Sequence, residues 1–214
     1  MKKILITSGA TCEPIDDVRF LSNISTGRTG AFLAETLAQR QAAVVLLRGQ
    51  AAVAPRGVES FCFGSTEDLQ RQLVAQLSGG DFGLVVHCAA VSDYRAEKTA
   101  TGKLSSDEQS LTLNLVPTPK LLPKLKNFSP TPLTVIGFKL TSGATEKERQ
   151  AAVEKLFASG TVDYVVHNDL SERAASGDNR PFRIFSAARQ AAAELTLDGL
   201  DALADWLHAL RAKR

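Results

Sequence analysis

The 214-residue sequence has little of what marks membrane, secreted and nucleic-acid-binding proteins. No apolar run approaches the roughly 18 residues of a membrane helix, and the N-terminus leads into a strand pattern without a signal peptide. The three cysteines, Cys12, Cys62 and Cys88, are too few and too widely spaced for a disulfide framework or a structural zinc site. Aromatic residues are 6% of the chain and the net charge is +2, too little for a nucleic-acid surface. We therefore expect a cytoplasmic protein that binds neither membranes nor nucleic acid.

Familiar nucleotide-binding and catalytic signatures are missing as well. Gly9 stands alone after the first expected strand, so GxGxxG is absent, as are GxxxxGK[ST] and GxSxG. A short-chain oxidoreductase would have GxxxGxG at that place, which this chain lacks. His87 and His167 each end an expected strand, but no third metal ligand is suitably spaced. We expect hydrogen-bonded histidines there and no metal site.

The chain does contain apolar runs that alternate with helical stripes, as in a mostly parallel sheet with helices on both faces. This predicts one doubly wound α/β domain over residues 1–214. Strands are expected at residues 4–8, 43–47, 60–63, 82–88, 134–138 and 162–166, with strand-like segments at 182–185 and 193–197. Helices are expected at residues 31–41, 65–77, 145–158 and from 200 onward.

Residues 89–119 break this alternation and predict an appendage to the sheet. They are rich in charge, Ser, Thr and Gly, and residues 110–116 alternate as a half-exposed antiparallel strand would. Apolar side chains outside the main sheet need another surface to bury them, so we expect a homodimer. Nearby prolines limit any helix at residues 120–125 to a short one.

Ligands of open α/β sheets bind where parallel strands end, which directs attention to four loops. The first, from Gly9 to Arg28, is longer than ordinary strand-to-helix connections, and such loops are commonly functional. Ser25, Thr26 and Gly27 end this loop directly before a helix, where hydroxyls, free N–H groups and the helix dipole favour an anion. Helix capping by Ser25 or Thr26, with glycines for close packing, explains the same pattern equally well.

The other three loops carry polar side chains of less specific meaning. Asp93 has the chemistry to bind a metal or a sugar hydroxyl, and Arg95 that to neutralise phosphates, although such charges are more often plain surface residues. Phe138 and Lys139 form a candidate pair for a base and a phosphate, with Phe138 as ordinary core the stronger alternative. Asn168 follows an apolar strand abruptly.

Five motifs in order resemble one known family over nearly the whole chain. Residues 7–16, TSGATCEPID, look like TxGxTxExID, and residues 18–27, VRFLSNISTG, are similar to VRxxSNxSxG. Residues 89–94, AAVSDY, residues 137–140, GFKL, and the pair at 168–169 follow with suitable spacing. The set resembles phosphopantothenoylcysteine synthetase, the phosphopantothenate-cysteine ligase of coenzyme A biosynthesis.

The resemblance implies a Rossmann-like domain, a small antiparallel dimerisation flap at about residues 95–120, and a homodimer. It also implies a Mg²⁺-dependent ligation of 4'-phosphopantothenate and L-cysteine through an acyl-nucleotidylate made from CTP or ATP. Its metal ligands are not assigned to residues of this chain. The length leaves no room for the flavin-dependent decarboxylase domain fused to many bacterial homologues. We therefore expect no FMN and a separate decarboxylase protein.

The resemblance also implies roles for individual residues. Asn23 matches the asparagine that contacts the acyl-nucleotidylate, and Arg19 an arginine that serves the substrate. Lys103 begins the stretch that reads KxKK in bifunctional members, but Ser105 and Ser106 replace its last two lysines here. This loss leaves a catalytically idle nucleotide-binding homologue with a regulatory role as the alternative function.

Nucleotide binding is expected at ten positions spread over the four loops. They are Gly9, Ser25, Thr26, Gly27, Ala89, Ala90, Asp93, Phe138, Lys139 and Asn168. Residues 138–140 read FKL, as in standalone members, where the bifunctional enzymes have FAAE. These motifs leave the choice between CTP and ATP open.

Overall fold

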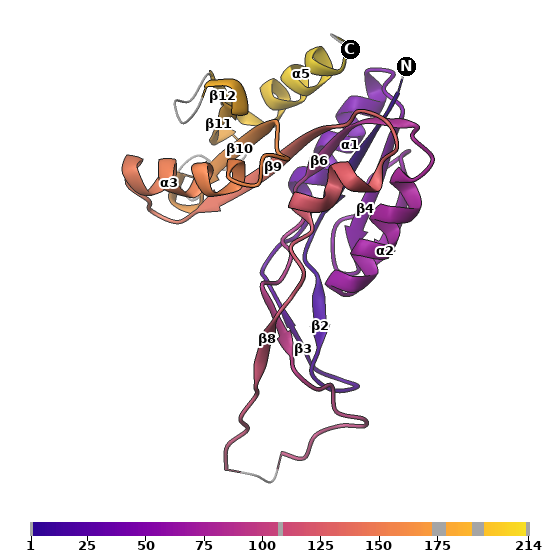
Figure 1. Cartoon of the computed structure of the whole chain (residues 1–214), viewed down its shortest axis with the longest axis vertical. Helices are drawn as coiled ribbons and strands as arrows, with labels where there is room; N and C mark the ends of the chain where they lie inside the picture. Colours follow the sequence, from indigo (N-terminus) through magenta and orange to yellow (C-terminus); the bar gives the residue numbers. More distant parts are fainter. Residues whose placement is uncertain (1, 107–108, 173–178, 190–194, 213–214) are drawn as a thin grey trace.

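The computed structural model describes residues 2–106, 109–172, 179–189 and 195–212, and its centre is an eight-stranded sheet. The strand order is β12-β11-β10-β9-β6-β1-β4-β5. Strands β10 to β5 of this order pair in parallel, and β11 pairs antiparallel with both β10 and β12. The strands are β1 Lys3–Ser8, β4 Val44–Gly49, β5 Glu59–Phe63, β6 Phe82–His87, β9 Thr134–Thr141, β10 Tyr164–Asp169, β11 Pro181–Ser186 and β12 Leu195–Asp198. The predicted mostly parallel α/β sheet is confirmed (Figure 1).

Helices cover both faces of this sheet. The helices are α1 Arg28–Gln39, α2 Thr66–Leu77, α3 Glu146–Phe157 and α5 Gly199–Ala212, with short 3-10 helices η1 Leu122–Phe128 and η3 Ala187–Arg189. Successive side chains of β1 point to opposite faces, as the strand period requires. Ile4 and Ile6 join the core under α1 and α5, whereas Leu5 joins the core under α2, α3 and η1. The body is therefore a three-layer α/β/α sandwich.

Two of the helices begin where the sequence predicts, because their first residues supply the missing hydrogen-bond partners. The Ser65 side chain accepts from the Asp68 N–H at the start of α2. Thr145 and Glu148 form a reciprocal capping box at the start of α3. Helix α1 begins differently, with Gly27 as its N-cap residue and without such a hydrogen bond from any described side chain.

Two hairpins leave the body together and form what we call the projection, residues 11–23, 92–106 and 109–118 (Figure 1). Strands β2 Cys12–Pro14 and β3 Phe20–Ser22 make one hairpin, and β7 Tyr94–Ala96 pairs with β8 Leu115–Pro117 in the other. Both arise from the ends of the neighbouring central strands β1 and β6, where Ala10 and Ala90 form an isolated parallel bridge.

The expected strand over residues 110–116 is wrong in its extent. Only Leu115–Pro117 forms a strand, because the partner strand β7 is three residues long, and one further backbone bond, from the Glu97 N–H to the Asn114 carbonyl, follows it. Leu111 and Leu113 stay exposed, at 57% and 39% of their surface. Alternation alone does not show whether a pairing partner exists.

Further differences from the expected elements are an additional hairpin and two longer strands. The β2–β3 hairpin inside the long first loop is not anticipated, since its strands are too short to show a period. Strands β9 and β10 run three residues beyond their expected ends at 138 and 166, to Thr141 and Asp169. Residues 193–194 of the last expected strand lie outside the described residues. No helix within the described ranges is long and apolar enough to cross a membrane.

Candidate functional site

A cavity of about 220 Å³ opens where four parallel strands end. Its walls come from the ends of β1, β6, β9 and β10, from the start of α1, and from residues just beyond β10 and before β11. The lining residues are Ser8, Gly9, Ile24, Ser25, Thr26, Gly27, Arg28, Thr29, Gly30, Cys88, Ala89, Ala90, Phe138, Leu140, Asn168, Leu170 and Arg180. This is the edge of the sheet at which sequence reasoning expected a ligand.

Helix α1 presents an N-terminus without a side-chain cap to this cavity. Its N-cap residue is Gly27, in the left-handed conformation, and among the described residues no side chain caps it. Neither Ser25 nor Thr26 fills that role, so the capping alternative is wrong. The first-turn N–H groups of a helix have no intrahelical partners, and they favour an anion.

Glycines let α1 start this close to the sheet. A Cβ on Gly30 would lie 2.3 Å from the Cβ of Ser8, at the end of β1. Gly27 has φ of +71°, and a Cβ there would lie 2.6 Å from the Cβ of Ala52. The expected close packing by these glycines is confirmed, and it brings the backbone N–H groups to the cavity.

The cavity floor at the end of β6 is held by a buried hydroxyl. The Thr7 hydroxyl lies 2.8 Å from Nδ1 of His87 and accepts from the Ala89 N–H at 3.2 Å. Burial lowers the pKa of His87 to about 4, so the imidazole is neutral near neutral pH. Burial also raises the pKa of the Cys88 thiol, which therefore stays protonated. This part of the cavity, at the end of β6, therefore contributes shape and backbone groups, without a charged side chain.

The opposite wall, after β9 and β10, is ordered by Asp169. Its carboxylate accepts from the side chains of Ser171 and Thr141, at 2.6 and 2.5 Å, and from the Gly143 N–H at 2.8 Å. The side-chain bonds from Ser171 and Thr141 outweigh burial and hold the pKa of Asp169 far below its usual range. Since Thr141 donates to Asp169, His167 Nε2 donates to Thr141 at 2.8 Å. Both strand-end histidines are hydrogen-bonded, as expected.

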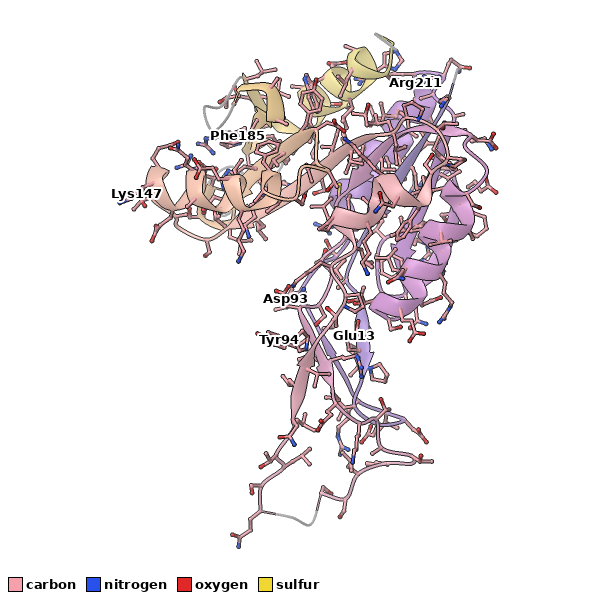
Figure 2. All side chains as sticks on the ribbon, in the orientation of Figure 1. Glu13, Asp93, Tyr94, Lys147, Phe185 and Arg211 are labelled. Atoms are coloured by element: carbon pink, nitrogen blue, oxygen red, sulfur yellow. The ribbon has the colours of Figure 1, made fainter. Side chains whose placement is uncertain are left out.

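Eight of the ten expected nucleotide positions line the cavity, and Asp93 and Lys139 do not. Asp93 is exposed on the projection, where it pairs with Lys120 (Figure 2). Phe138 is half-buried and lines the cavity, and it also packs against the core under α1 and α5. Phe138 is therefore both a core residue and part of the cavity lining.

The three expected catalytic residues all lie outside the cavity lining. Asn23 is exposed next to the lining residue Ile24, and its Nδ2 donates to the Val91 carbonyl at 3.3 Å. Arg19 and Lys103 lie farther out on the projection, in segments that contact each other. Arg19 donates to Asp16 at 2.5 Å and to the carbonyl of Leu104, the neighbour of Lys103, at 3.2 Å.

Asp16 joins these two segments of the projection. Its carboxylate accepts from the N–H groups of Val18, Arg19 and Leu104, at 2.9, 2.7 and 3.0 Å. Burial raises the pKa of Asp16, but the hydrogen bonds from Val18, Leu104 and Arg19 outweigh it and lower the value to about 2. The turn that carries Arg19 and the segment that carries Lys103 are thus held together by hydrogen bonds.

The base of the projection is fixed on α2 through a second buried carboxylate. Glu13 accepts from the Thr66 N–H and hydroxyl, at 2.8 and 2.6 Å, at the first turn of α2. The Thr11 hydroxyl accepts from the Ser92 N–H and, since the proton of Thr66 goes to Glu13, donates to the Thr66 hydroxyl, so both hairpins meet at this point. Figure 2 shows Glu13 and Asp93 in the part of the projection near the body.

Sequence reasoning missed two arginines of the cavity, Arg28 and Arg180. Arg28 is the first residue of α1 and is exposed. Arg180, just before β11, is buried and reaches α1, where its Nη2 donates to Thr29 Oγ1 at 2.9 Å. No sequence signal links residues 151 positions apart, so Arg180 was apparent only from the fold.

With this geometry in hand, comparison with known proteins identifies the family. A model of the DNA/pantothenate metabolism flavoprotein C-terminal domain matches residues 1–207. The chain belongs to this family. Its relatives include the coenzyme A biosynthesis bifunctional protein CoaBC of Thermococcus kodakarensis, 37% identical over 170 residues. That match covers 79% of this chain and 41% of the relative, so the chain spans less than half the length of such relatives. The resemblance drawn from the motifs is confirmed.

Solved structures agree with the family and the fold. The DNA/pantothenate metabolism flavoprotein from Streptococcus pneumoniae matches with a TM-score of 0.86 at 27% identity, over 100% of both chains. A Cab2 mutant in complex with phosphopantothenate-cysteine matches with a TM-score of 0.79 at 19% identity, over 100% of this chain and 89% of that one. The second likeness is one of fold, and the expected Rossmann-like fold is confirmed by it.

Proposed function

We propose that this protein is a phosphopantothenate-cysteine ligase, which joins 4'-phosphopantothenate to L-cysteine in coenzyme A biosynthesis with CTP or ATP as co-substrate. One observation carries the proposal. In a chain of this family, the start of α1 is uncapped by the described side chains and opens on a cavity at the strand ends. Names of relatives in coenzyme A biosynthesis support the pathway.

The proposed reaction has two steps. In the first, a carboxylate oxygen of 4'-phosphopantothenate attacks the α-phosphorus of the nucleotide, and pyrophosphate leaves. In the second, the amine of cysteine attacks the acyl carbon, loses a proton, and expels the nucleoside monophosphate. Neither step needs a covalent bond to the protein, so catalysis depends on positioning the reactants and on stabilising developing negative charge.

The nucleotide half of this reaction suits the cavity of the body. The first-turn N–H groups of α1 and the hydroxyls of Ser25 and Thr26 suit phosphate oxygens. Phe138 offers a face for the base, and Asn168 a polar group beside it. We propose these residues for the nucleotide, together with Gly9, Gly27 and the backbone of residues 89–90.

The acyl half suits the mouth of the cavity, where the projection begins. Asn23 lies between the lining residue Ile24 and the loop after β6, so its amide suits the activated acyl group. Arg19 and Lys103 belong to the unit held together by Asp16, and we propose that they serve the substrate's charged groups. Asp93 and Lys139 keep their proposed nucleotide roles as residues beside the cavity.

The Mg²⁺ of the proposed reaction does not fit a protein-built site. The cavity lining contains no carboxylate, and no described group of three or more His, Cys, Asp or Glu residues is arranged to hold a metal ion. Mg²⁺ usually keeps several waters and binds nucleotide phosphates with few protein ligands. We propose that it enters with the nucleotide.

A homodimer belongs to the proposal because the projection exposes large apolar side chains. They are Val18, Phe20, Tyr94, Leu111, Leu113 and Leu115, with exposed fractions from 39% to 61%. Exposed large apolar side chains gathered on one part of a protein are typical of interaction sites. Size-exclusion chromatography with light scattering tests it, and a monomer at micromolar concentration would contradict it.

The deciding experiment measures pyrophosphate release with 4'-phosphopantothenate, cysteine and Mg²⁺, in parallel with CTP and with ATP. Release that depends on 4'-phosphopantothenate, together with formation of the cysteine conjugate, is the expected result. No release with either nucleotide sinks the proposal. Nucleotide binding without turnover would instead favour the idle homologue, which the shortened lysine run after Lys103 supports.

A further inference from the structure

We propose that Arg180 binds the phosphates of the nucleotide and steadies the pyrophosphate as it leaves. This inference rests on the proposed function and adds to it a residue that no motif assigns. It concerns the body of the protein, whereas the lysine expected to meet the phosphates, Lys103, lies on the projection.

The position of Arg180 is the first argument. The side chain lines the cavity although the residue is only 4% exposed. Its Nη2 donates to the hydroxyl of Thr29, a residue in the first turn of α1, at 2.9 Å. The guanidinium therefore lies at the same end of α1 as the first-turn N–H groups. Positive charge and backbone donors meet at one place in the cavity.

The packing of Arg180 is the second argument. Its Cζ lies 4.7 Å from the ring centroid of Phe182, which is fully buried. Its carbonyl accepts from the Gly199 N–H at 3.1 Å, at the start of α5. A guanidinium stacked on a ring and hydrogen-bonded to a fixed helix has few other positions to adopt. Such a group is preorganised for a phosphate, which arginine recognises with two parallel donors.

The lysine run of the projection is the third argument. Ser105 and Ser106 occupy the places of two lysines, so positive charge has been lost near Lys103. Arg180 supplies positive charge to the same reaction from the body, in a residue that adjoins β11 and is hydrogen-bonded to the start of α5. A leaving pyrophosphate carries several negative charges, and a nearby cation lowers the free energy of the transition state.

Arg183, in β11, offers a comparison with Arg180, which directly precedes this strand. It lies on the other face of β11 and pairs with Glu172 through two contacts of 2.9 and 2.6 Å. Arg183 does not line the cavity. Arg183, within β11, is thus placed to stabilise the fold, whereas Arg180, just before the strand, is placed at the cavity.

The experiment compares wild type, Arg180→Gln, Arg180→Lys and Arg183→Gln by steady-state kinetics with CTP and ATP. For Arg180→Gln we expect the nucleotide KM to rise about 10- to 100-fold, as for loss of a hydrogen bond between charged groups. The KM for cysteine should change less than about twofold, and inhibition by inorganic pyrophosphate should weaken in parallel with the nucleotide KM. Arg180→Lys should lie between Gln and wild type, since it keeps the charge and loses the fork.

A structural role for Arg180 would give a different pattern. It would lower the melting temperature of Arg180→Gln and of Arg183→Gln alike, without a selective change in nucleotide KM or pyrophosphate inhibition. A folded Arg180→Gln protein with wild-type values for both overturns the inference. Failure of both Arg180 variants to fold, with Arg183→Gln folded, overturns it too, because the residue is then needed for folding.

Direct binding separates this inference from the proposed function. If wild type releases no pyrophosphate, the ligase proposal fails, but calorimetry with CTP, ATP and inorganic pyrophosphate still tests Arg180. Binding by wild type that weakens about 10-fold or more in Arg180→Gln supports the inference. Equal binding by both proteins, or no binding of any of the three by wild type, overturns it.

Discussion

The body and the projection of this protein prepare their parts of the candidate site in different ways. In the body, the cavity offers mainly backbone groups at strand ends and at the start of α1, and buried hydrogen bonds hold its walls in place. In the projection, the candidate groups are the side chains of Asn23, Arg19 and Lys103 on short hairpins. A single substitution leaves the backbone N–H and C=O groups in place, whereas it removes the functional group of a side chain. The comparison predicts that the projection is more sensitive to loss of one functional group, and the body to changes in packing.

Asn23→Ala tests the projection and should have the largest effect. We expect the rate of ligation to fall about 100- to 1000-fold, the loss seen when one preorganised donor is removed from a developing charge. Nucleotide binding, which we assign to the body, should stay within about threefold of wild type. Stopped-flow pyrophosphate release and calorimetry with CTP and ATP measure the two quantities.

The matched substitution in the body is Ser25→Ala, which removes a hydroxyl but leaves the N–H groups of α1. Its rate should fall less than about 10-fold, since a neutral hydrogen bond contributes only about 1 kcal/mol. An effect of Ser25→Ala as large as that of Asn23→Ala would contradict the distinction between the two regions.

Gly30→Ala tests the packing of the body and comes next in size. The added Cβ would meet the Ser8 Cβ at 2.3 Å, so α1 must shift away from the strand end. We expect a loss of about 1–3 kcal/mol in the free energy of unfolding, as for other overpacked cores. Nucleotide affinity should fall with it. Urea denaturation and calorimetry provide the measurements.

Gly79→Ala serves as the control for this prediction. A Cβ on Gly79 would meet nothing nearer than 3.9 Å, and its φ lies outside the left-handed region. Its effect on unfolding should stay within about 0.5 kcal/mol. Equal effects at the two glycines would show that the close approach of α1 to β1 is not needed.

Asp16→Asn sharpens the comparison from within the projection, with a smaller effect. The amide cannot accept all the bonds that the Asp16 carboxylate accepts from Val18, Arg19 and Leu104. The segments of Arg19 and Lys103 should separate, and the rate should fall about 10-fold. Hydrogen exchange should become faster at the Val18 and Leu104 amides and stay unchanged in β1. Wild-type exchange at both amides in the variant would contradict this role.

The pH dependence of this contact follows from the lowered pKa of Asp16. Its folded pKa of about 2 lies below the ordinary value of 3.8, so the carboxylate's contribution is fully present above about pH 4. It is lost as the pH falls from about 4 through about 2. Acid should therefore speed exchange at Leu104 over this window in wild type only, after correction for intrinsic exchange rates.

The last prediction concerns His87, which lies in the body. Its substitution should affect activity least, and the expected change is in the pH dependence of stability. Its folded pKa of about 4 lies below the ordinary 6.5, so the unfolded chain binds a proton that the folded one does not. The free energy of unfolding should fall as the pH falls from about 6.5 to about 4, by on the order of 3 kcal/mol. His87→Gln should reduce this slope, measured by urea denaturation at pH 7 and pH 5. An unchanged slope would contradict a buried neutral His87.

The sequence by itself determined the mostly parallel sheet and the edge at which the cavity lies. Buried parallel strands such as β6 are continuous apolar runs, and their polar ends, such as Asn168, mark one edge by topology alone. The cap of α2 at Ser65 was equally local, because capping depends on residues a few positions apart. The ordered motifs also identified the family before any geometry was known.

Only the tertiary structure decided how distant residues meet. The uncapped start of α1 could not be told from a capped one until the Gly27 conformation was seen. The contact between Arg180 and Thr29, and the Asp16 contact with the segment of Lys103, join residues far apart in the chain. Periodicity records which face of an element is buried and leaves its neighbour unspecified. For that reason the cavity was foreseen, while its buried arginine and the coupling within the projection were not.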